Sequence, residues 1–280
     1  MAENNCSGSC STCGQDCASR KAESLLEPAN PASDVKRVIG VVSGKGGVGK
    51  SLVTGLLAAL AARQGLSAGI MDADLTGPSI PKMFGVEGQP DATDVGILPK
   101  ESAGGVKLMS INLLLEDPGD PVVWRGPVIT GVVKQFWKDV SWGDLDVLFI
   151  DMPPGTGDVP LTVFQSIPLD GIVIVSTPQE LVGMIVEKAV RMAGKMNIPV
   201  LGLVENMAYV ACPDCGRKIN IFGESRLEKD AAEHGIEATA QLPVMPDLAK
   251  LVDAGRMDEA PSEAIDPLYG VLQSALGREE

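Results

Sequence analysis

The chain has 280 residues, of which 45% are hydrophobic and 21% are charged. This composition excludes a wholly disordered chain and can bury the core of one large or two small domains. Lysine and arginine number 23 against 37 aspartate and glutamate residues, so the formal net charge is −14. Because such a field repels phosphate backbones and anionic lipid headgroups, we expect neither nucleic acid nor a membrane among the partners.

The first 33 residues are rich in serine, asparagine, glycine, alanine and proline and show no apolar periodicity. We interpret residues 1–33 as a flexible, cysteine-rich arm, and residues 34–280 as the folded domain. The arm lacks the basic segment and the apolar run of a secretory signal, which predicts a cytoplasmic protein. In that reducing compartment, closely spaced thiols are metal ligands more often than disulfides.

From residue 37 onward, apolar strands alternate with helical patterns. Such near-continuous apolar strands predict an α/β fold with a doubly wound, mainly parallel sheet flanked by helices. Ligands bind such sheets at the carboxyl ends of the strands. Strands are expected over 37–43, 66–74, 146–154, 171–178 and 198–207, with helices over 52–65 and 179–196, and shorter closing segments over 238–244 and 262–276.

A glycine-rich loop follows the first strand, and its sequence matches the pattern G-x-x-x-x-G-K-S/T. Glycines allow positive φ, so successive backbone N–H groups can surround phosphates at the N-terminus of the next helix. Lys50 is expected to reach the β- and γ-phosphates, and the Ser51 hydroxyl to bind Mg²⁺. A turn whose glycines serve packing alone is the alternative. The expected nucleotide-binding residues are Gly44, Lys45, Gly46, Gly47, Val48, Gly49, Lys50 and Ser51.

Acidic residues end two of the predicted strands. Asp151 follows a buried strand and is expected beside the loop, where it can hold Mg²⁺ directly or through water. Asp72 and Asp74 are two residues apart and therefore share one side of an extended strand. One of them, which we expect to be Asp74, can position the attacking water. A polar residue that simply ends a buried strand would account for one such aspartate, but poorly for three.

Five segments together carry a resemblance to a known family: GKGGVGKS (44–51), DADLTGPS (72–79), DMPPGTGD (151–158), ENM (205–207) and CPDC (212–215). They resemble the Mrp/NBP-type ATPases that act as iron-sulfur cluster carriers, from about residue 37 to the C-terminus. The loop is of the deviant Walker A type, whose additional early lysine is Lys45 here. The same loop occurs in chromosome-partitioning and division-site ATPases and in the nitrogenase iron protein.

The resemblance implies a P-loop NTPase fold, ATP with Mg²⁺, and a homodimer in which Lys45 acts on the nucleotide of the partner subunit. It implies that Asp74 positions water, that Asp151 lies on the Mg²⁺ side and that Asn206 contacts adenine. Lys45, Lys50 and Asp74 are thus the expected catalytic residues. A solvated loop charge is the alternative for Lys45.

The six cysteines form two separate groups, which indicates metal or redox chemistry rather than packing. Cys212 and Cys215 supply two thiolates, which do not complete a tetrahedral site. The resemblance implies that a homodimer joins two such pairs around one [4Fe-4S] cluster. Structural zinc is the competing interpretation, and a redox dithiol is less favoured because neither C-x-x-C segment opens a helix.

The N-terminal group, Cys6, Cys10, Cys13 and Cys17, places four thiols within twelve residues, enough to hold a cluster unaided. Its spacing departs from that of the four-cysteine arm of the eukaryotic NBP-type carriers. Labile metal binding by a tail is the alternative for this group.

The sequence therefore predicts an ATP hydrolase that binds iron-sulfur clusters and transfers them to apoprotein acceptors. Two other classes share the loop. The first is a spatial-organising ATPase of the division-site or chromosome-partitioning kind. The acidic balance and the short C-terminal segment disfavour that class. The second is a nucleotide-driven electron donor.

Overall fold

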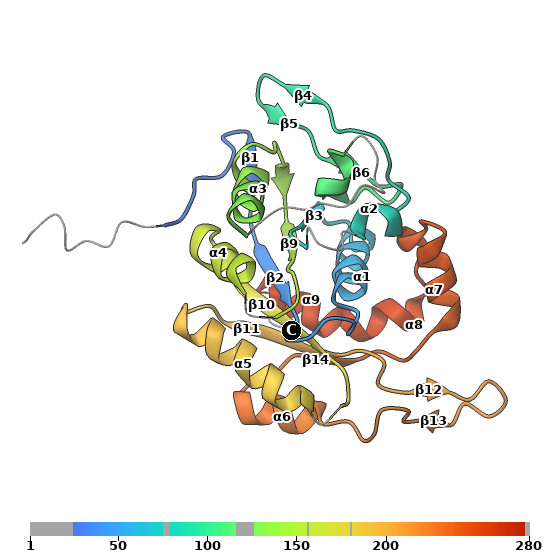
Figure 1. Cartoon of the computed structure of the whole chain (residues 1–280). Coiled ribbons are helices and arrows are strands. Elements are labelled where there is room, and N and C mark those ends of the chain that lie inside the picture. Colours follow the sequence, from blue (N-terminus) through green and yellow to red (C-terminus); the bar gives the residue numbers. More distant parts are fainter. Residues whose placement is uncertain (1–24, 75–78, 116–125, 156, 180, 278–280) are drawn as a thin grey trace, which may run out of the picture.

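An eight-stranded sheet forms the centre of the chain (Figure 1). The computed structural model describes residues 25–74, 79–115, 126–155, 157–179 and 181–277. The strands lie in the order β14-β11-β10-β2-β9-β3-β7-β6, and all pair in parallel except β6 with β7. Their bounds are β2 (Val38–Val42), β3 (Ala68–Asp72), β6 (Lys100–Glu101), β7 (Lys107–Met109), β9 (Val147–Asp151), β10 (Gly171–Ser176), β11 (Val200–Glu205) and β14 (Thr239–Gln241).

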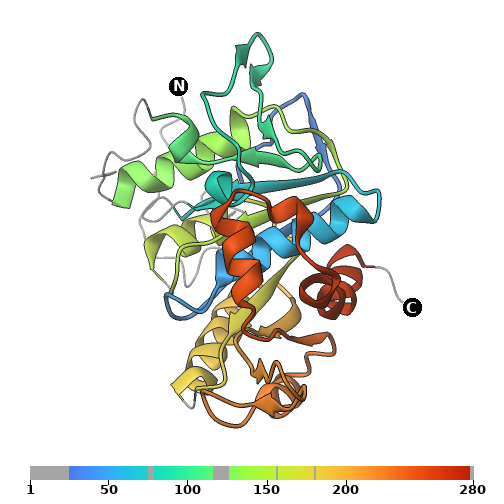
Figure 2. The same ribbon diagram turned by 90° about the vertical axis from the view of Figure 1, so that its right-hand side faces the viewer.

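Helices cover both faces of the sheet and bury two separate clusters of apolar side chains. One face carries α1 with the C-terminal helices, and the other carries α3, α4, α5 and α6 (Figures 1 and 2). The predicted doubly wound architecture is confirmed. The helices are α1 (Lys50–Arg63), α2 (Ile80–Met83), α3 (Gly126–Lys138), α4 (Asp158–Ser166), α5 (Leu181–Lys195), α6 (Leu227–His234), α7 (Pro246–Asp253), α8 (Ser262–Ile265) and α9 (Tyr269–Leu276).

The inner strands β2, β3, β9 and β10 are buried at every position. This explains why they read as continuous apolar runs, since a parallel sheet covered on both faces has no solvated side. Their carboxyl ends meet at one edge, where Asp72 pairs in register with Asp151. The sheet therefore brings two of the predicted acidic residues together.

The predicted closing helix over 262–276 is not continuous. It divides into α8, a 3-10 turn at Asp266–Leu268 and α9. Pro267 lies in that turn, and a proline removes the backbone donor that a continuous helix would need there. Three short pairs lie outside the main sheet: β1 (Ser33–Val35) with β8 (Gly143–Leu145), β4 (Ala92–Thr93) with β5 (Gly96–Ile97), and β12 (Val210–Ala211) with β13 (Lys218–Ile219).

The described inner end of the predicted arm, residues 27–33, contacts the folded domain. The Glu27 backbone N–H donates to the Ser166 carbonyl, and the Glu27 carbonyl accepts from Trp137 Nε1. Asn30 is 4% exposed, and its Nδ2 donates to the Val95 carbonyl. Residues 27–33 are therefore held against the domain by buried polar contacts that composition alone does not reveal. Residues 1–24 lie outside the described residues.

No helix within the described ranges combines the length and the apolar character needed to cross a bilayer.

Candidate functional site

The loop between β2 and α1 adopts the backbone geometry that its glycines predict. Gly47 and Gly49 have φ of 82° and 84°, in the left-handed region. Gly49 also lacks room for a side chain, because a Cβ there would collide with the buried Nδ2 of Asn206. Since α1 begins at Lys50, the loop leads directly into the positive end of a helix dipole.

Lys50 and Asp151 form a buried ion pair under the loop. Lys50 Nζ lies 2.6 Å from Asp151 Oδ1, and the two side chains are 6% and 1% exposed. Asp151 also accepts hydrogen bonds from Ser51 Oγ at 2.5 Å and from Thr54 Oγ1 at 2.9 Å. One carboxylate therefore gathers the loop's lysine and two hydroxyls of α1, and its charge is fully hydrogen-bonded despite burial.

Asp74 and Asp72 have different environments, although the sequence places them on one side of the strand. Asp74 Oδ2 lies 3.7 Å from Lys50 Nζ, and the Asp74 side chain is 15% exposed. Asp72 is fully buried, accepts from Ser110 Oγ at 3.0 Å and accepts from the Asp74 backbone N–H at 3.1 Å. Asp74 is thus the carboxylate with access to solvent near Lys50, and Asp72 fixes the backbone that presents it.

Burial raises the pKa of Asp72 to about 8, and the neighbouring Asp151 carboxylate acts in the same direction. The Lys50 ammonium and the Ser110 hydroxyl oppose this shift by favouring the charged form. The site therefore contains two adjacent carboxyl groups in unequal environments, of which only Asp151 contacts the lysine directly.

Asn206 lies against the loop at the end of β11. Its Nδ2 donates to the Val48 carbonyl at 2.9 Å, and its side chain is buried. Next to it is an apolar hollow of about 180 Å³. The hollow is referred to below as the base hollow, because the resemblance implies that Asn206 contacts adenine. Its lining residues are Leu52, Leu56, Asn206, Met207, Leu242, Pro243, Val244, Met245, Leu248 and Ala249.

Lys45 is exposed, whereas Lys50 is buried. Its Nζ donates to Gln179 Oε1, in the segment after β10, at 3.3 Å. An exposed lysine on the rim of the loop is available to a second molecule, whereas Lys50 is committed to the interior. The two lysines of the loop thus have separate surroundings.

The donor set at this edge suits magnesium and a nucleoside phosphate. Mg²⁺ prefers oxygen ligands, and the Ser51 hydroxyl and the Asp151 carboxylate lie next to each other. The buried Ser43 hydroxyl, at the start of the loop, has no hydrogen-bond partner within the described part of the chain. A phosphate oxygen in the loop would give it one.

Cys212 and Cys215 lie away from this site, on a projecting segment that we call the Cys arm, residues 207–224. Figure 1 shows its two short strands, β12 and β13, extending from the body of the protein. The Gly216 N–H donates to the Cys212 carbonyl, and Gly216 has φ of 69°, so the thiols lie in a tight turn. Among the described residues, no third cysteine, histidine or carboxylate joins the two thiols in a metal-binding group.

Backbone N–H groups of Asp214 and Cys215, together with the Cys215 thiol, lower the pKa of the Cys212 thiol. Hydrogen bonds to sulfur favour the thiolate, which is the form that binds metal. The turn is therefore suited to thiolate ligation, although it supplies only part of a ligand set.

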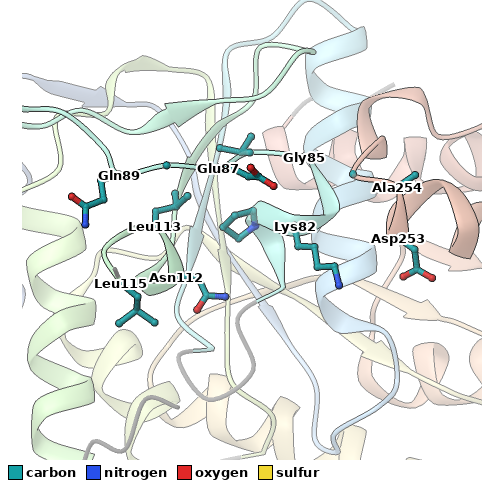
Figure 3. A pocket seen from close by; sticks show the side chains of 13 residues that line it. Lys82, Gly85, Glu87, Gln89, Asn112, Leu113, Leu115, Asp253 and Ala254 are labelled. Atoms are coloured by element: carbon teal, nitrogen blue, oxygen red, sulfur yellow. The ribbon is translucent and has the colours of Figure 1, made fainter. Parts of the chain in front are cut away.

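A separate hollow lies between α2, the 3-10 turn at Ile111–Leu113 and the end of α7 (Figure 3). It has a volume of about 860 Å³ and contains none of the predicted site residues.

The structure brings together the loop, Lys50, Ser51, Asp74, Asp151 and Asn206. It leaves Cys212 and Cys215 on the Cys arm, and Cys6, Cys10, Cys13 and Cys17 lie outside the described residues. Sequence reasoning missed Thr54, Ser110 and the base hollow. Thr54 lies four residues after Lys50 and so shares its helix face, a spacing that could have indicated it. Nothing local in the sequence indicates Ser110.

Comparisons with known proteins find relatives of this chain by sequence and by fold. The family model described as ParA, NUBPL iron-transfer P-loop NTPase, matches residues 34–275. A protein of Clostridium perfringens named iron-sulfur cluster carrier protein is 44% identical, over 96% of this chain and 99% of its own length.

Among solved structures, a nucleotide-binding protein of Archaeoglobus fulgidus, in complex with ADP and with Co found, is 47% identical. The match covers 82% of this chain and 90% of that one, with a TM-score of 0.74. The cell division ATPase MinD of Pyrococcus furiosus is 19% identical, with a TM-score of 0.57 over 85% of this chain and 98% of its own, and shows likeness of fold alone.

We predict that Asp72→Asn makes the folded protein less sensitive to rising pH. The raised pKa means that the folded state holds a proton between the ordinary value of 3.8 and about 8, whereas the unfolded state does not. The wild type therefore loses stability across that range as pH rises. The melting temperature of the variant relative to wild type should increase by several degrees from pH 5 to pH 8.5, since ~1 kcal/mol corresponds to roughly 2–4 °C.

Asp74→Asn is the matched control for this measurement, because it removes a carboxyl two residues away that is not fully buried. The difference in melting temperature between Asp72→Asn and wild type could also stay constant with pH. That result would show that Asp72 does not make the stability of the wild type fall as pH rises.

Proposed function

Because the chain belongs to the family of NUBPL-type iron-transfer P-loop NTPases, we propose that it is an ATP-dependent carrier that binds an iron-sulfur cluster and delivers it to apoproteins. The name of the Clostridium perfringens relative, iron-sulfur cluster carrier protein, supports this proposal over nearly the whole chain. The cluster is the cargo of the protein, and ATP is its substrate.

One structural observation supports cluster carriage in particular. The Cys pair, Cys212 and Cys215, has no third ligand within the described residues, yet its turn favours the thiolate. An incomplete pair on a projecting arm can be completed by a second copy of the chain. Two pairs give the four thiolates that a four-iron cluster needs. We therefore propose a homodimer with the cluster between its Cys arms.

At the nucleotide site, the loop N–H groups and Lys50 bind the phosphates of ATP, and the base enters the base hollow beside Asn206. Lys50 would turn from Asp151 toward the β- and γ-phosphate oxygens, which leaves the Asp151 carboxylate and the Ser51 hydroxyl to hold Mg²⁺. The metal, when bound, neutralises charge on the transferring phosphoryl group. Asp74, near Lys50 and partly exposed, orients the attacking water.

Cluster delivery requires no redox step. Each iron–thiolate bond to the carrier breaks as one to an acceptor thiolate forms, and the acceptor's thiol protons leave to solvent or to the released carrier thiolates. Slow ATP hydrolysis would set whether the dimer holds or releases the cluster, since a ligand shifts a two-state equilibrium only through its differential affinity for the two states.

The competing classes lead to different observations. A spatial-organising ATPase would co-sediment with liposomes or DNA in the presence of ATP. An electron donor would couple reversible reduction of its cluster to ATP. A structural zinc site would exclude iron from Cys212 and Cys215 and would survive exposure to air.

The first test is anaerobic reconstitution with iron and sulfide, followed by transfer to an apo-acceptor. We expect Cys212→Ala and Cys215→Ala each to reduce loading at the arm and to reduce transfer, because each removes one thiolate of a four-thiolate set. Lys50→Ala should abolish nucleotide binding while it leaves the cysteines intact. Unchanged loading and transfer in both cysteine variants would contradict the role of the Cys pair.

The second test addresses Lys45, whose exposure on the rim supports action on the partner's nucleotide. Lys45→Ala and Lys50→Ala should each be inactive as ATPases. Mixed together, they should recover about a quarter of the wild-type rate, because half of randomly assorted dimers are mixed and each has one complete site. Arg63→Ala, on the far end of α1, is the control. No recovery on mixing would show that Lys45 acts within its own subunit.

A further inference from the structure

The Cys arm is rooted in the wall of the base hollow. It leaves the sheet after Asn206, and Met207, its first residue, lines the hollow. Asn206 itself donates to the loop carbonyl of Val48. The nucleotide site and the segment that carries the Cys pair are therefore adjacent in sequence as well as in space.

Backbone hydrogen bonds join the root of the arm to the opposite wall of the hollow. The Leu242 N–H donates to the Glu205 carbonyl, the Ala208 N–H to the Leu242 carbonyl, and the Val244 N–H to the Tyr209 carbonyl, at 2.9, 2.9 and 2.8 Å. Leu242 and Val244 line the hollow. A base that displaces this wall therefore also displaces residues 208 and 209.

The returning end of the arm is tied to the same place by side chains. Glu205 is 2% exposed, and its Oε2 accepts from Gln241 Nε2 at 3.1 Å. The same nitrogen donates to Ser225 Oγ at 2.7 Å. An amide nitrogen carries two protons, so Gln241 can satisfy both acceptors at once. Ser225 Oγ in turn accepts from the Leu227 N–H, at the start of α6.

Through these contacts, Glu205, Gln241 and Ser225 form one hydrogen-bonded group at the base of the Cys arm. They close the two ends of the Cys arm onto the strand that continues into the wall of the base hollow. A buried carboxylate is costly to leave without a hydrogen-bond partner, so the three side chains favour one arrangement over intermediate ones. Such an element can pass a change at the hollow to the arm.

We propose that Glu205, Gln241 and Ser225 form a clasp that couples nucleotide occupancy of the base hollow to cluster binding by the Cys pair. This inference rests on the proposed carrier function and adds the residues that link its two sites. They are positioning residues, because in this arrangement they act through the arm and touch neither phosphate nor cluster.

The coupling between the two sites can be measured, because thermodynamic linkage makes it reciprocal. If nucleotide changes cluster affinity by some factor, then cluster changes nucleotide affinity by the same factor. The affinity for ADP and for a non-hydrolysable ATP analogue is measured by anaerobic calorimetry on the full chain, with and without reconstituted cluster. For wild type, we expect the affinity for a given nucleotide with cluster to differ from its affinity without cluster by roughly 5- to 150-fold. This is the usual range for coupled sites.

Ser225→Ala and Gln241→Leu should bring that factor close to one, while each variant still loads cluster and hydrolyses ATP. Ser225→Ala is the milder change, because Ser225 is exposed, and it tests the proposal even if Gln241→Leu folds poorly. The control is Ser274→Ala. It removes a serine hydroxyl that donates to the Leu201 carbonyl at 2.7 Å, on the same strand but away from the arm, and should retain the wild-type factor.

Three outcomes overturn the clasp. If both variants keep the wild-type ratio of nucleotide affinities with and without cluster, the clasp does not transmit the coupling. A factor of one in wild type that does load cluster would leave the carrier function standing without coupling. A wild type that loads no cluster at all would overturn the carrier function, and the clasp with it.

Discussion

The buried ion pair between Lys50 and Asp151 is the interaction on which the rest of the site depends. Its two charges are almost wholly removed from water. Such a pair persists only with good geometry and further hydrogen bonds, and removal of one partner typically costs about 3–5 kcal/mol. Ser51 and Thr54 supply those bonds to Asp151. The end of β9 and the first turn of α1 are thereby fixed relative to each other.

Because Lys50 and Asp151 are paired, a bound phosphate would also change the surroundings of the acidic residues at this edge of the sheet. Phosphate oxygens would compete with Asp151 for the Lys50 ammonium, and the released carboxylate would then need a cation of its own. Asp72 lies in register beside Asp151 and is held by Ser110 on the next strand's connection. The pairing of neighbouring strands thus places two carboxyl groups and the Ser110 hydroxyl at one edge of the sheet. On the other side, Asn206 joins the loop to the root of the Cys arm.

The sequence predicts much of this fold because strands buried on both faces leave an unambiguous apolar pattern. The loop was equally clear, since glycine at residues 47 and 49 meets a backbone requirement that few other residues can meet. Helix α3 is not predicted, although its apolar residues recur at helical spacing, because its β-branched and glycine residues lower its helix propensity. The different burial of Asp72 and Asp74 was not predictable, because it arises from Ser110, which is distant in sequence. The attachment of Asn30 depends likewise on Val95 and Trp137.

The central claim is that Cys212 and Cys215 hold iron jointly with a second copy of the chain. The most direct measurement is Mössbauer spectroscopy with elemental analysis on anaerobically purified protein in which Cys6, Cys10, Cys13 and Cys17 are replaced by serine, so that only the Cys pair remains. Joint ligation by two chains predicts a single four-iron cluster for every two chains and a dimer in solution. Zinc in place of iron, or a monomer that retains its full metal content, would contradict it.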